Sequence, residues 1–193
     1  MTVKATLLAL PLALVIVGCS FGPKVPPTLM RLSADAAPAA AAGRTAPTAQ
    51  AITVVPPSVA QELRTPRVPV RTGGTSVAYL PDAQWVEAPA NLFARLLSET
   101  IAARTGRVVL DPKQFTFDPG QRLTGTLHSF GLQADSSEAV VIYDAALARG
   151  SDAVETRRFE ARVPVVAVDA ASAPDALNRA ANQVAAEVAA WVG

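Results

Sequence analysis

RLTGTLHSFGL (residues 122–132), AVVIYDAALA (139–148) and RFEARVPVVAV (158–168) follow one another with short connections rich in Asp, Ser and Gly. Apolar and polar residues alternate along them, which is typical of β-strands with one buried face. Strands that follow each other without an intervening helix pair antiparallel, so the three segments predict a meander. In the third, the expected core-facing residues are Phe159, Ala161, Val163 and Val165. The residues between them, Arg158, Glu160 and Arg162, are expected to face solvent.

Two amphipathic helices are predicted to form a second layer. Pro89–Thr105 has an apolar stripe at helical spacing, with a proline in its first turn and Gly106 directly after its end. Ala173–Val192 has a second stripe, and Ser172 with Asp175 resembles a capping box. A sheet with one solvated face packs its helices on the other. We therefore expect an α+β fold, an antiparallel sheet built on the meander with both helices on one face.

Shorter elements are predicted upstream of the meander. A β-branched run at 51–55 ends at Pro56-Pro57, and Gly73-Gly74 is a hairpin turn signal. The expected short strands are 28–32, 51–55, 67–71, 75–80 and 107–110. Residues 33–50 are a low-complexity Ala/Pro/Thr stretch without periodicity, which predicts a flexible segment.

The N-terminus has the sequence pattern of a targeting segment. A basic start at Met1–Lys4 precedes the apolar run Ala5–Gly18, which is shorter than the roughly 20 residues that span a bilayer. Residues 16–19 (IVGC) resemble a bacterial lipobox, where cleavage precedes the cysteine and its thiol takes a diacylglycerol. We expect a signal peptide at 1–18, a lipidated tether at 19–27 that begins with Cys19, and one domain at 28–193. The alternative is an ordinary secreted protein with a cysteine near its cleavage site.

Composition and motifs exclude several function classes. The 193 residues include 17 basic and 16 acidic side chains, a net charge of +1 that argues against nucleic acid as a partner. One Cys and one His exclude a disulfide framework and argue against a metal site. The phosphate-loop, dinucleotide and nucleophile-elbow motifs are absent from the sequence, so we expect no cofactor. His128 has no carboxylate or serine at a meaningful spacing, and we expect no catalytic residues and no enzymatic activity.

Several landmarks in order resemble the ABC-type transport auxiliary lipoprotein family. They are a lipobox, a P-x-L-x-x-L strand, an L-x-x-P segment that ends in Arg, a W-x-E-x-P turn into a helix, and a closing Trp-Val pair. The residues that carry the resemblance are Cys19, Pro27, Leu29, Leu32, Leu63, Pro66, Val68, Val70, Arg71, Trp85, Glu87, Pro89, Trp191 and Val192. The resemblance covers residues 28–193.

The resemblance implies a non-catalytic, lipid-anchored component of an intermembrane lipid transport system. Its implied partners are an MCE-domain protein and an ABC permease with its ATPase, and a homo-oligomeric ring is one arrangement it allows. Ser20, rather than Asp, follows the acylated cysteine and favours the periplasmic face of the outer membrane. Arg71, Trp85 and Arg158 are the candidate partner-binding residues, although the same positions suit a core tryptophan and two solvated strand charges. The alternative function is an outer-membrane assembly lipoprotein that binds lipid or lipopolysaccharide, or stabilises a barrel partner.

Overall fold

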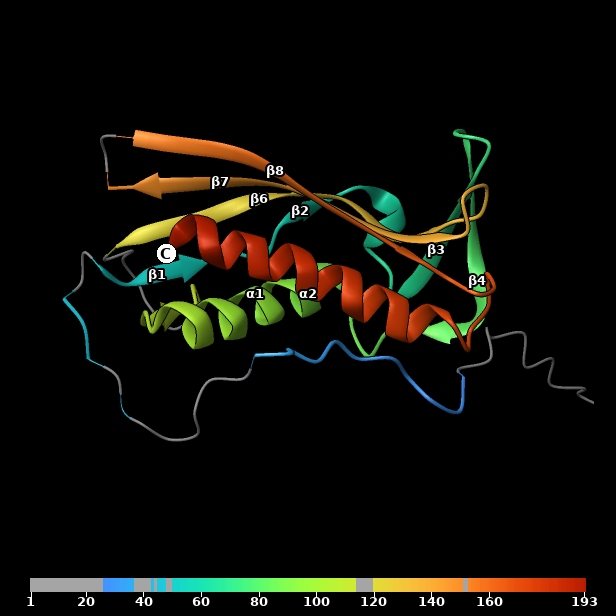
Figure 1. Cartoon of the computed structure of the whole chain (residues 1–193), viewed down its shortest axis with the longest axis horizontal. Helices are drawn as coiled ribbons and strands as arrows, with labels where there is room; N and C mark the ends of the chain where they lie inside the picture. Colours follow the sequence, from blue (N-terminus) through green and yellow to red (C-terminus); the bar gives the residue numbers. More distant parts are fainter. Residues whose placement is uncertain (1–25, 37–42, 44, 48–49, 114–119, 151–152) are drawn as a thin grey trace, which may run out of the picture.

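The three long predicted strands form the centre of one sheet, which two helices cover on one face (Figure 1). The structure is a computed structural model that describes residues 26–36, 43, 45–47, 50–113, 120–150 and 153–193. Helices α1 (Pro89–Thr105) and α2 (Ala173–Val192) begin and end at the predicted residues. The α+β fold class is therefore confirmed. The predicted signal peptide and Cys19 lie outside the described residues.

The meander is confirmed in strands β6 (Gln121–Gln133), β7 (Glu138–Arg149) and β8 (Ala153–Pro164). β7 pairs antiparallel with β6 on one side and with β8 on the other, along the whole of its length. β8 begins at Ala153 rather than Arg158, and it ends at Pro164 rather than Val168. The polar residues at its start are compatible with a strand because β8 is an edge strand, where solvated side chains are tolerated.

The sheet is mixed, whereas the sequence predicted antiparallel pairing alone. Strands β1 (Ile52–Val54), β2 (Ser58–Val59) and β3 (Arg67–Thr72) lie one after another along the second edge of β6, parallel to it. Pro56-Pro57 and the 3-10 turn η2 (Gln61–Leu63) interrupt this line without reversing it.

The parallel pairing follows from the path of α1. Strand β4 (Ser76–Gln84) forms a hairpin with β3, and α1 then carries the chain back along the sheet (Figure 1). As a result β5 (Val109–Leu110) runs parallel to β1, and β6 starts at the same end of the sheet as β1. A helical crossover of this kind cannot be recognised from the alternation of the strands that it connects.

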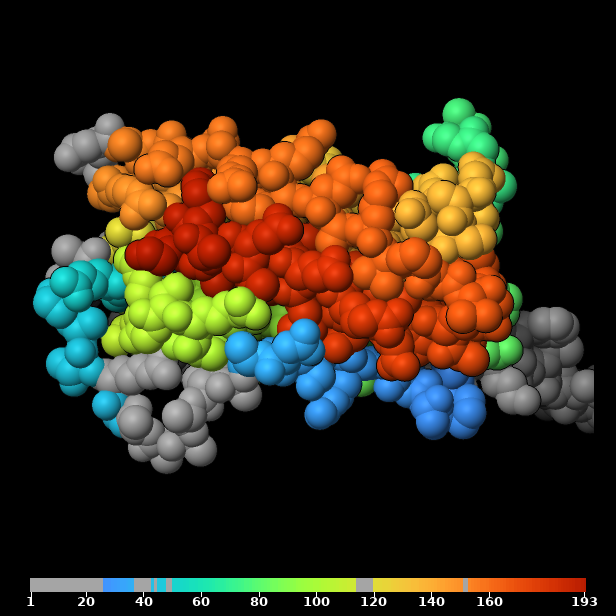
Figure 2. Space-filling view, in the orientation of Figure 1, coloured from blue at the N-terminus to red at the C-terminus, as the bar shows by residue number. Residues whose placement is uncertain are grey.

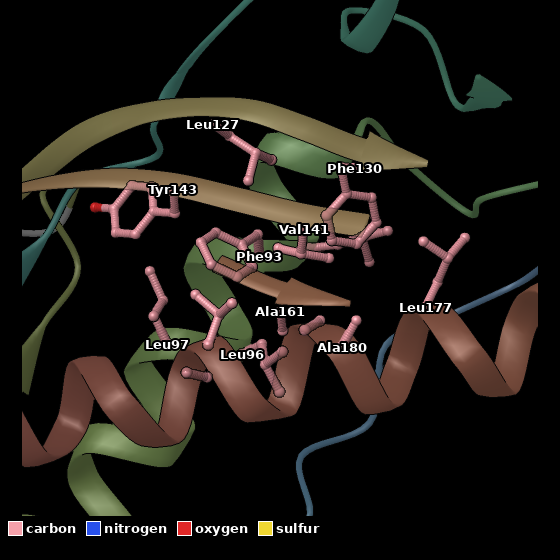
Figure 3. Close-up of a cluster of buried hydrophobic side chains, with 14 of the residues drawn as sticks. Phe93, Leu96, Leu97, Leu127, Phe130, Val141, Tyr143, Ala161, Leu177 and Ala180 are labelled. Atoms are coloured by element: carbon pink, nitrogen blue, oxygen red, sulfur yellow. The ribbon is translucent and has the colours of Figure 1, made fainter. Parts of the chain in front are cut away.

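The core lies between the helices and the inner face of the sheet, and aromatic rings fill its centre (Figure 3). Phe93 of α1 packs edge-on against Tyr143, with ring centroids 5.2 Å apart, and lies 6.3 Å from Phe130. The Tyr143 hydroxyl donates a 2.7 Å hydrogen bond to the carbonyl of Thr124, and burial raises the pKa of this phenol. The aromatic cluster thus joins α1 to β6 and β7.

The cap of α2 differs from the predicted capping box. The Ser172 side chain makes no capping hydrogen bond. Instead the Asp169 carboxylate accepts hydrogen bonds from the backbone N–H groups of Ala171 (3.1 Å) and Ser172 (2.8 Å), which lowers its pKa. A carboxylate that bonds the backbone two and three residues ahead forms a turn that leads into the helix.

Gly131 of β6 provides a test of the parallel pairing between β3 and β6. A Cβ atom at this position would lie 2.3 Å from the Pro69 carbonyl oxygen, a backbone atom that cannot move aside without shifting β3. We predict that Gly131→Ala lowers the free energy of unfolding by about 1–3 kcal/mol, the usual cost of overpacking. Urea denaturation measures this change. Gly43→Ala is the matched control because its Cβ would meet no atom within 4 Å, and equal stability loss in both variants would contradict the packing of β3 on β6.

Candidate partner-binding surface

The outer face of the sheet, opposite the helices, carries an ion-paired network. Asp144 on β7 lies directly opposite Arg158 on β8. The Arg158 Nε and Nη2 atoms donate to the two carboxylate oxygens of Asp144 at 2.6 and 2.7 Å, a bidentate geometry. His128 Nε2 lies 2.8 Å from Asp144 Oδ2. A single carboxylate therefore joins side chains from three adjacent strands.

Arg71 extends this network across the sheet. Its Nε donates to Glu62 at 3.0 Å, and its Nη2 donates to the backbone carbonyl of His128 at 2.9 Å. Two of the three candidate partner-binding residues are therefore linked through His128. Arg71 bonds its backbone carbonyl, and Arg158 shares the Asp144 carboxylate with its ring. We call this set of five residues the outer-face network: Glu62, Arg71, His128, Asp144 and Arg158.

Charge pairing dominates the electrostatics of the network. The Arg158 guanidinium lowers the pKa of the Asp144 carboxyl to about 2, and the hydrogen bond with His128 acts in the same direction. The Asp144 side chain is 37% exposed and that of Arg158 is 61% exposed, so solvent screens much of this attraction. The network is therefore a solvated, charged surface rather than a buried ionic cluster.

Trp85, the third candidate, does not belong to this surface. Its side chain is 1% exposed and packs against Phe130 with ring centroids 5.4 Å apart. Trp85 follows the end of β4 and forms a bridge with Met30, so the chain covers it from the outside. The structure therefore places Trp85 in the core, away from the exposed surface that carries Arg71 and Arg158.

A bulge in β6 explains why the sequence did not indicate the contact between His128 and Asp144. The pairing of β6 with β7 shifts between Leu127 and Ser129, and His128 is the extra residue. The bulge turns His128 outward and keeps both Leu127 and Phe130 in the core. A strict period of two would place Leu127 and Phe130 on opposite faces of the sheet. Two large apolar residues three positions apart in a strand are therefore the sequence signal of this bulge.

The outer-face network combines one histidine with carboxylate and guanidinium groups. The His128 ring bonds a carboxylate, as a general base would, but that carboxylate is already held by Arg158. Among the described residues, no serine or threonine hydroxyl is hydrogen-bonded to the ring. No group of three potential metal ligands occurs in the same part of the chain either. The network presents acidic and basic side chains side by side, with their positions fixed by hydrogen bonds.

Strand β8 borders the network and has one open edge. It pairs with β7, and no second neighbour lies among the described strands. All six residues from Ala153 to Arg158 are exposed, and Val154 is 67% exposed. Farther along the strand, Arg162 pairs with Glu160 at 2.6 Å and with Glu138 at 3.3 Å. Such charges limit uncontrolled strand pairing and leave the edge available to a complementary partner.

A groove of about 460 Å³ lies between α1 and β5. Its lining combines apolar residues with five charged side chains, Glu87, Arg95, Glu99, Asp111 and Lys113. This mixed lining is unlike the predominantly apolar wall that an acyl chain requires. In the described part of the chain, no helix has the length and apolar character that would allow it to cross a membrane.

Comparison with known proteins identifies the family to which the chain belongs. The family model for the ABC-type transport auxiliary lipoprotein component matches residues 31–189. The chain belongs to this family.

Two crystal structures share the fold. A DUF330 protein from Xanthomonas campestris is 21% identical, with a TM-score of 0.67 over 85% of this chain and 94% of that one. An uncharacterized protein is 16% identical, with a TM-score of 0.66 over 75% of this chain and 92% of that one. At these identities the likeness concerns the fold alone. No curated protein matches the chain.

The pKa of Asp144 tests the geometry of the outer-face network. Because Arg158 lowers this pKa to about 2, Arg158→Ala should raise it toward the ordinary value of 3.8. The interaction stabilises the fold at pH values above about 4, and this contribution is lost as the pH falls toward 2. Carboxyl-detected NMR titration measures the shift. Arg162→Ala removes a neighbouring arginine that pairs with other carboxylates and should leave Asp144 unchanged, so a similar rise in both variants would contradict the pairing.

Proposed function

We propose that this chain is a non-catalytic, lipid-anchored component of an ABC/MCE-type intermembrane lipid transport system. In this role it binds the periplasm-spanning MCE-domain protein at the periplasmic face of the outer membrane. Membership of the transport auxiliary lipoprotein family supports the general role. The observation that carries the docking role is the open, charged edge of β8 next to the outer-face network.

The geometry of β8 suits a protein partner. A partner strand could add to the unpaired backbone groups of the 12-residue edge, while the alternating charges select the register. The strand is about 40 Å long at the usual rise per residue, so its start and its end lie at opposite ends of the molecule (Figure 1). A partner that approaches from across the periplasm could therefore reach β8 while the protein stays anchored.

The rival role, an assembly lipoprotein that holds lipid or lipopolysaccharide, receives less support. Its requirement is an apolar site for acyl chains. The groove between α1 and β5 carries charges of both signs, and the helix faces that look toward the sheet are occupied by the core. Native mass spectrometry of the purified protein would detect bound lipid if this rival role were correct.

In-cell photocrosslinking tests the docking role. A photoreactive residue at Thr156, an exposed position on β8, should give adducts to an MCE-domain protein. The same residue at Gln183, exposed on α2 on the other side of the molecule, should give none. Adducts from Thr156 to an outer-membrane barrel would favour the rival role, and adducts to a second copy of the chain would assign the edge to a homo-oligomeric ring.

The proposed anchor is tested at Cys19. Cys19→Ser removes the only thiol of the chain, so incorporation of labelled palmitate and release of residues 1–18 should both be lost. Ser20→Ala should retain both properties. Ser20→Asp should retain the label but move the protein from the outer to the inner membrane. Palmitate incorporation into Cys19→Ser equal to that into the natural chain would contradict acylation at Cys19.

A further inference from the structure

A strap formed by residues 26–36 crosses the surface of the helices before the fold begins (Figures 1 and 2). The Met30 N–H donates to the Gln84 carbonyl at 2.7 Å, and the Val86 N–H donates to the Met30 carbonyl at 2.9 Å. Met30 is buried, and Leu32 and Ala34 pack against the core. The strap is therefore joined to the end of β4 at a defined point.

Two asparagines on α2 hold the rest of the strap. Asn178 Oδ1 accepts from the Ser33 N–H, and Asn182 Oδ1 accepts from the Asp35 N–H, each at 2.9 Å. Asn182 Nδ2 donates to the Ser33 carbonyl, also at 2.9 Å. The two side chains lie one helical turn apart on α2. Together they present two amide oxygens as acceptors and one amide N–H as donor to the strap backbone, much as the edge of a β-strand does. Asn182 is 6% exposed, so its amide is committed to this contact.

The strap limits where the proposed lipid anchor can lie. The seven peptide steps from Cys19 to Pro26 span at most about 25 Å when fully extended. Helix α2 alone is about 30 Å long. Without the strap, the free chain would run from Cys19 to Ile52 and could extend to roughly 110 Å, enough to let either end of the domain face the membrane.

Exposed apolar side chains gather at the end where the strap begins. We call it the strap end; it is formed by the β3–β4 turn, the β6–β7 turn and the β8–α2 connection (Figure 1). Leu29 (45% exposed) and Val86 (49%) flank the bridge between Met30 and Trp85. Val77 (43%) lies next to the β3–β4 turn, and Val166 (101%) lies in the β8–α2 connection. The remaining large exposed hydrophobic residue of the described chain, Val154, lies at the opposite end, where β8 begins.

We propose that the strap end is a lipid-binding surface that lies against the membrane, with the strap as the device that sets this orientation. The inference rests on the acylation of Cys19 in the proposed function. Exposed charges of both signs lie near this end, namely Arg31, Arg67 and Arg162 and Asp82, Asp135 and Asp169. Apolar contact and the anchor, rather than attraction to anionic lipids, therefore provide the binding. The start of β8 then points away from the membrane, toward a partner in the periplasm.

Two valines at opposite ends of the molecule allow a matched test. The acylated chain has no free thiol, so Val166→Cys and Val154→Cys each introduce one site for an environment-sensitive fluorophore. The full lipidated chain is inserted into phosphatidylcholine vesicles that contain a spin-labelled lipid as quencher. Quenching at position 166 should exceed that at position 154 at least about threefold, because the two ends of α2 alone are about 30 Å apart.

Releasing the strap should remove this difference. In Met30→Asp/Asn178→Ala/Asn182→Ala, which removes the buried Met30 side chain as well as both asparagine contacts, the ratio of quenching should fall toward one. Because loss of a buried asparagine can destabilise the fold, a second variant leaves the domain intact and inserts about 20 Gly/Ser residues after Ser20, which adds a mean reach of roughly 25 Å. This variant should also lower the ratio.

The outcomes separate the orientation from the anchor. Equal quenching at positions 166 and 154 in a chain that floats with the vesicles would overturn the proposed surface alone. A chain that does not float, or whose Cys19 still reacts with thiol reagents, would overturn the acylation and with it the proposed function. Fluorescence at position 166 that responds to protein concentration but not to the lipid quencher would assign the strap end to a second copy and also overturn the proposal.

Discussion

The two-sided pairing of β6 is the constraint on which the rest of the structure depends. β7 follows one edge of this strand from Gln121 to Gln133, while β1, β2 and β3 share the other edge. A strand paired on both sides has to satisfy two registers at once while keeping its large side chains toward the helices. The bulge at His128 meets this requirement, because it keeps Leu127 and Phe130 in the core and leaves a polar residue outside.

The same bulge connects the core to the outer surface. Phe130 enters the aromatic cluster with Phe93 and Trp85, while His128 contacts Asp144 on the opposite face. A surface supported by a rigid, two-sided ladder keeps its charges at fixed spacing, which a protein partner can match. In the proposed role, the strap holds one end of this rigid body at the membrane, and β8 presents its charged edge along the length of the molecule.

Local patterns predicted most elements, but not how the candidate partner-binding residues lie relative to one another. Arg71 and Arg158 were expected at a binding surface, and the structure joins them through Asp144 and His128. Trp85 was expected there too but lies in the core, because the strap covers the end of β4. Ser172 occupies the N-cap position of α2 without a side-chain hydrogen bond, and the Asp169 carboxylate instead accepts from the backbone N–H groups of Ala171 and Ser172 just before the helix. The lipobox concerns residues 16–19, which the described structure does not include.

The sequence by itself determined the bounds of both helices and the meander of β6, β7 and β8. These features depend on periodicity, capping glycine and short connections, all of which are local properties of the chain. Only the tertiary structure decided the parallel pairing of β1, β2 and β3, the outer-face network and the strap. Each of these brings together residues far apart in the chain, such as Ser33 and Asn178, and their contacts depend on how α1 and α2 pack on the sheet. Local sequence does not indicate these contacts, because hydrogen bonds and packing between segments far apart in the chain determine which residues meet.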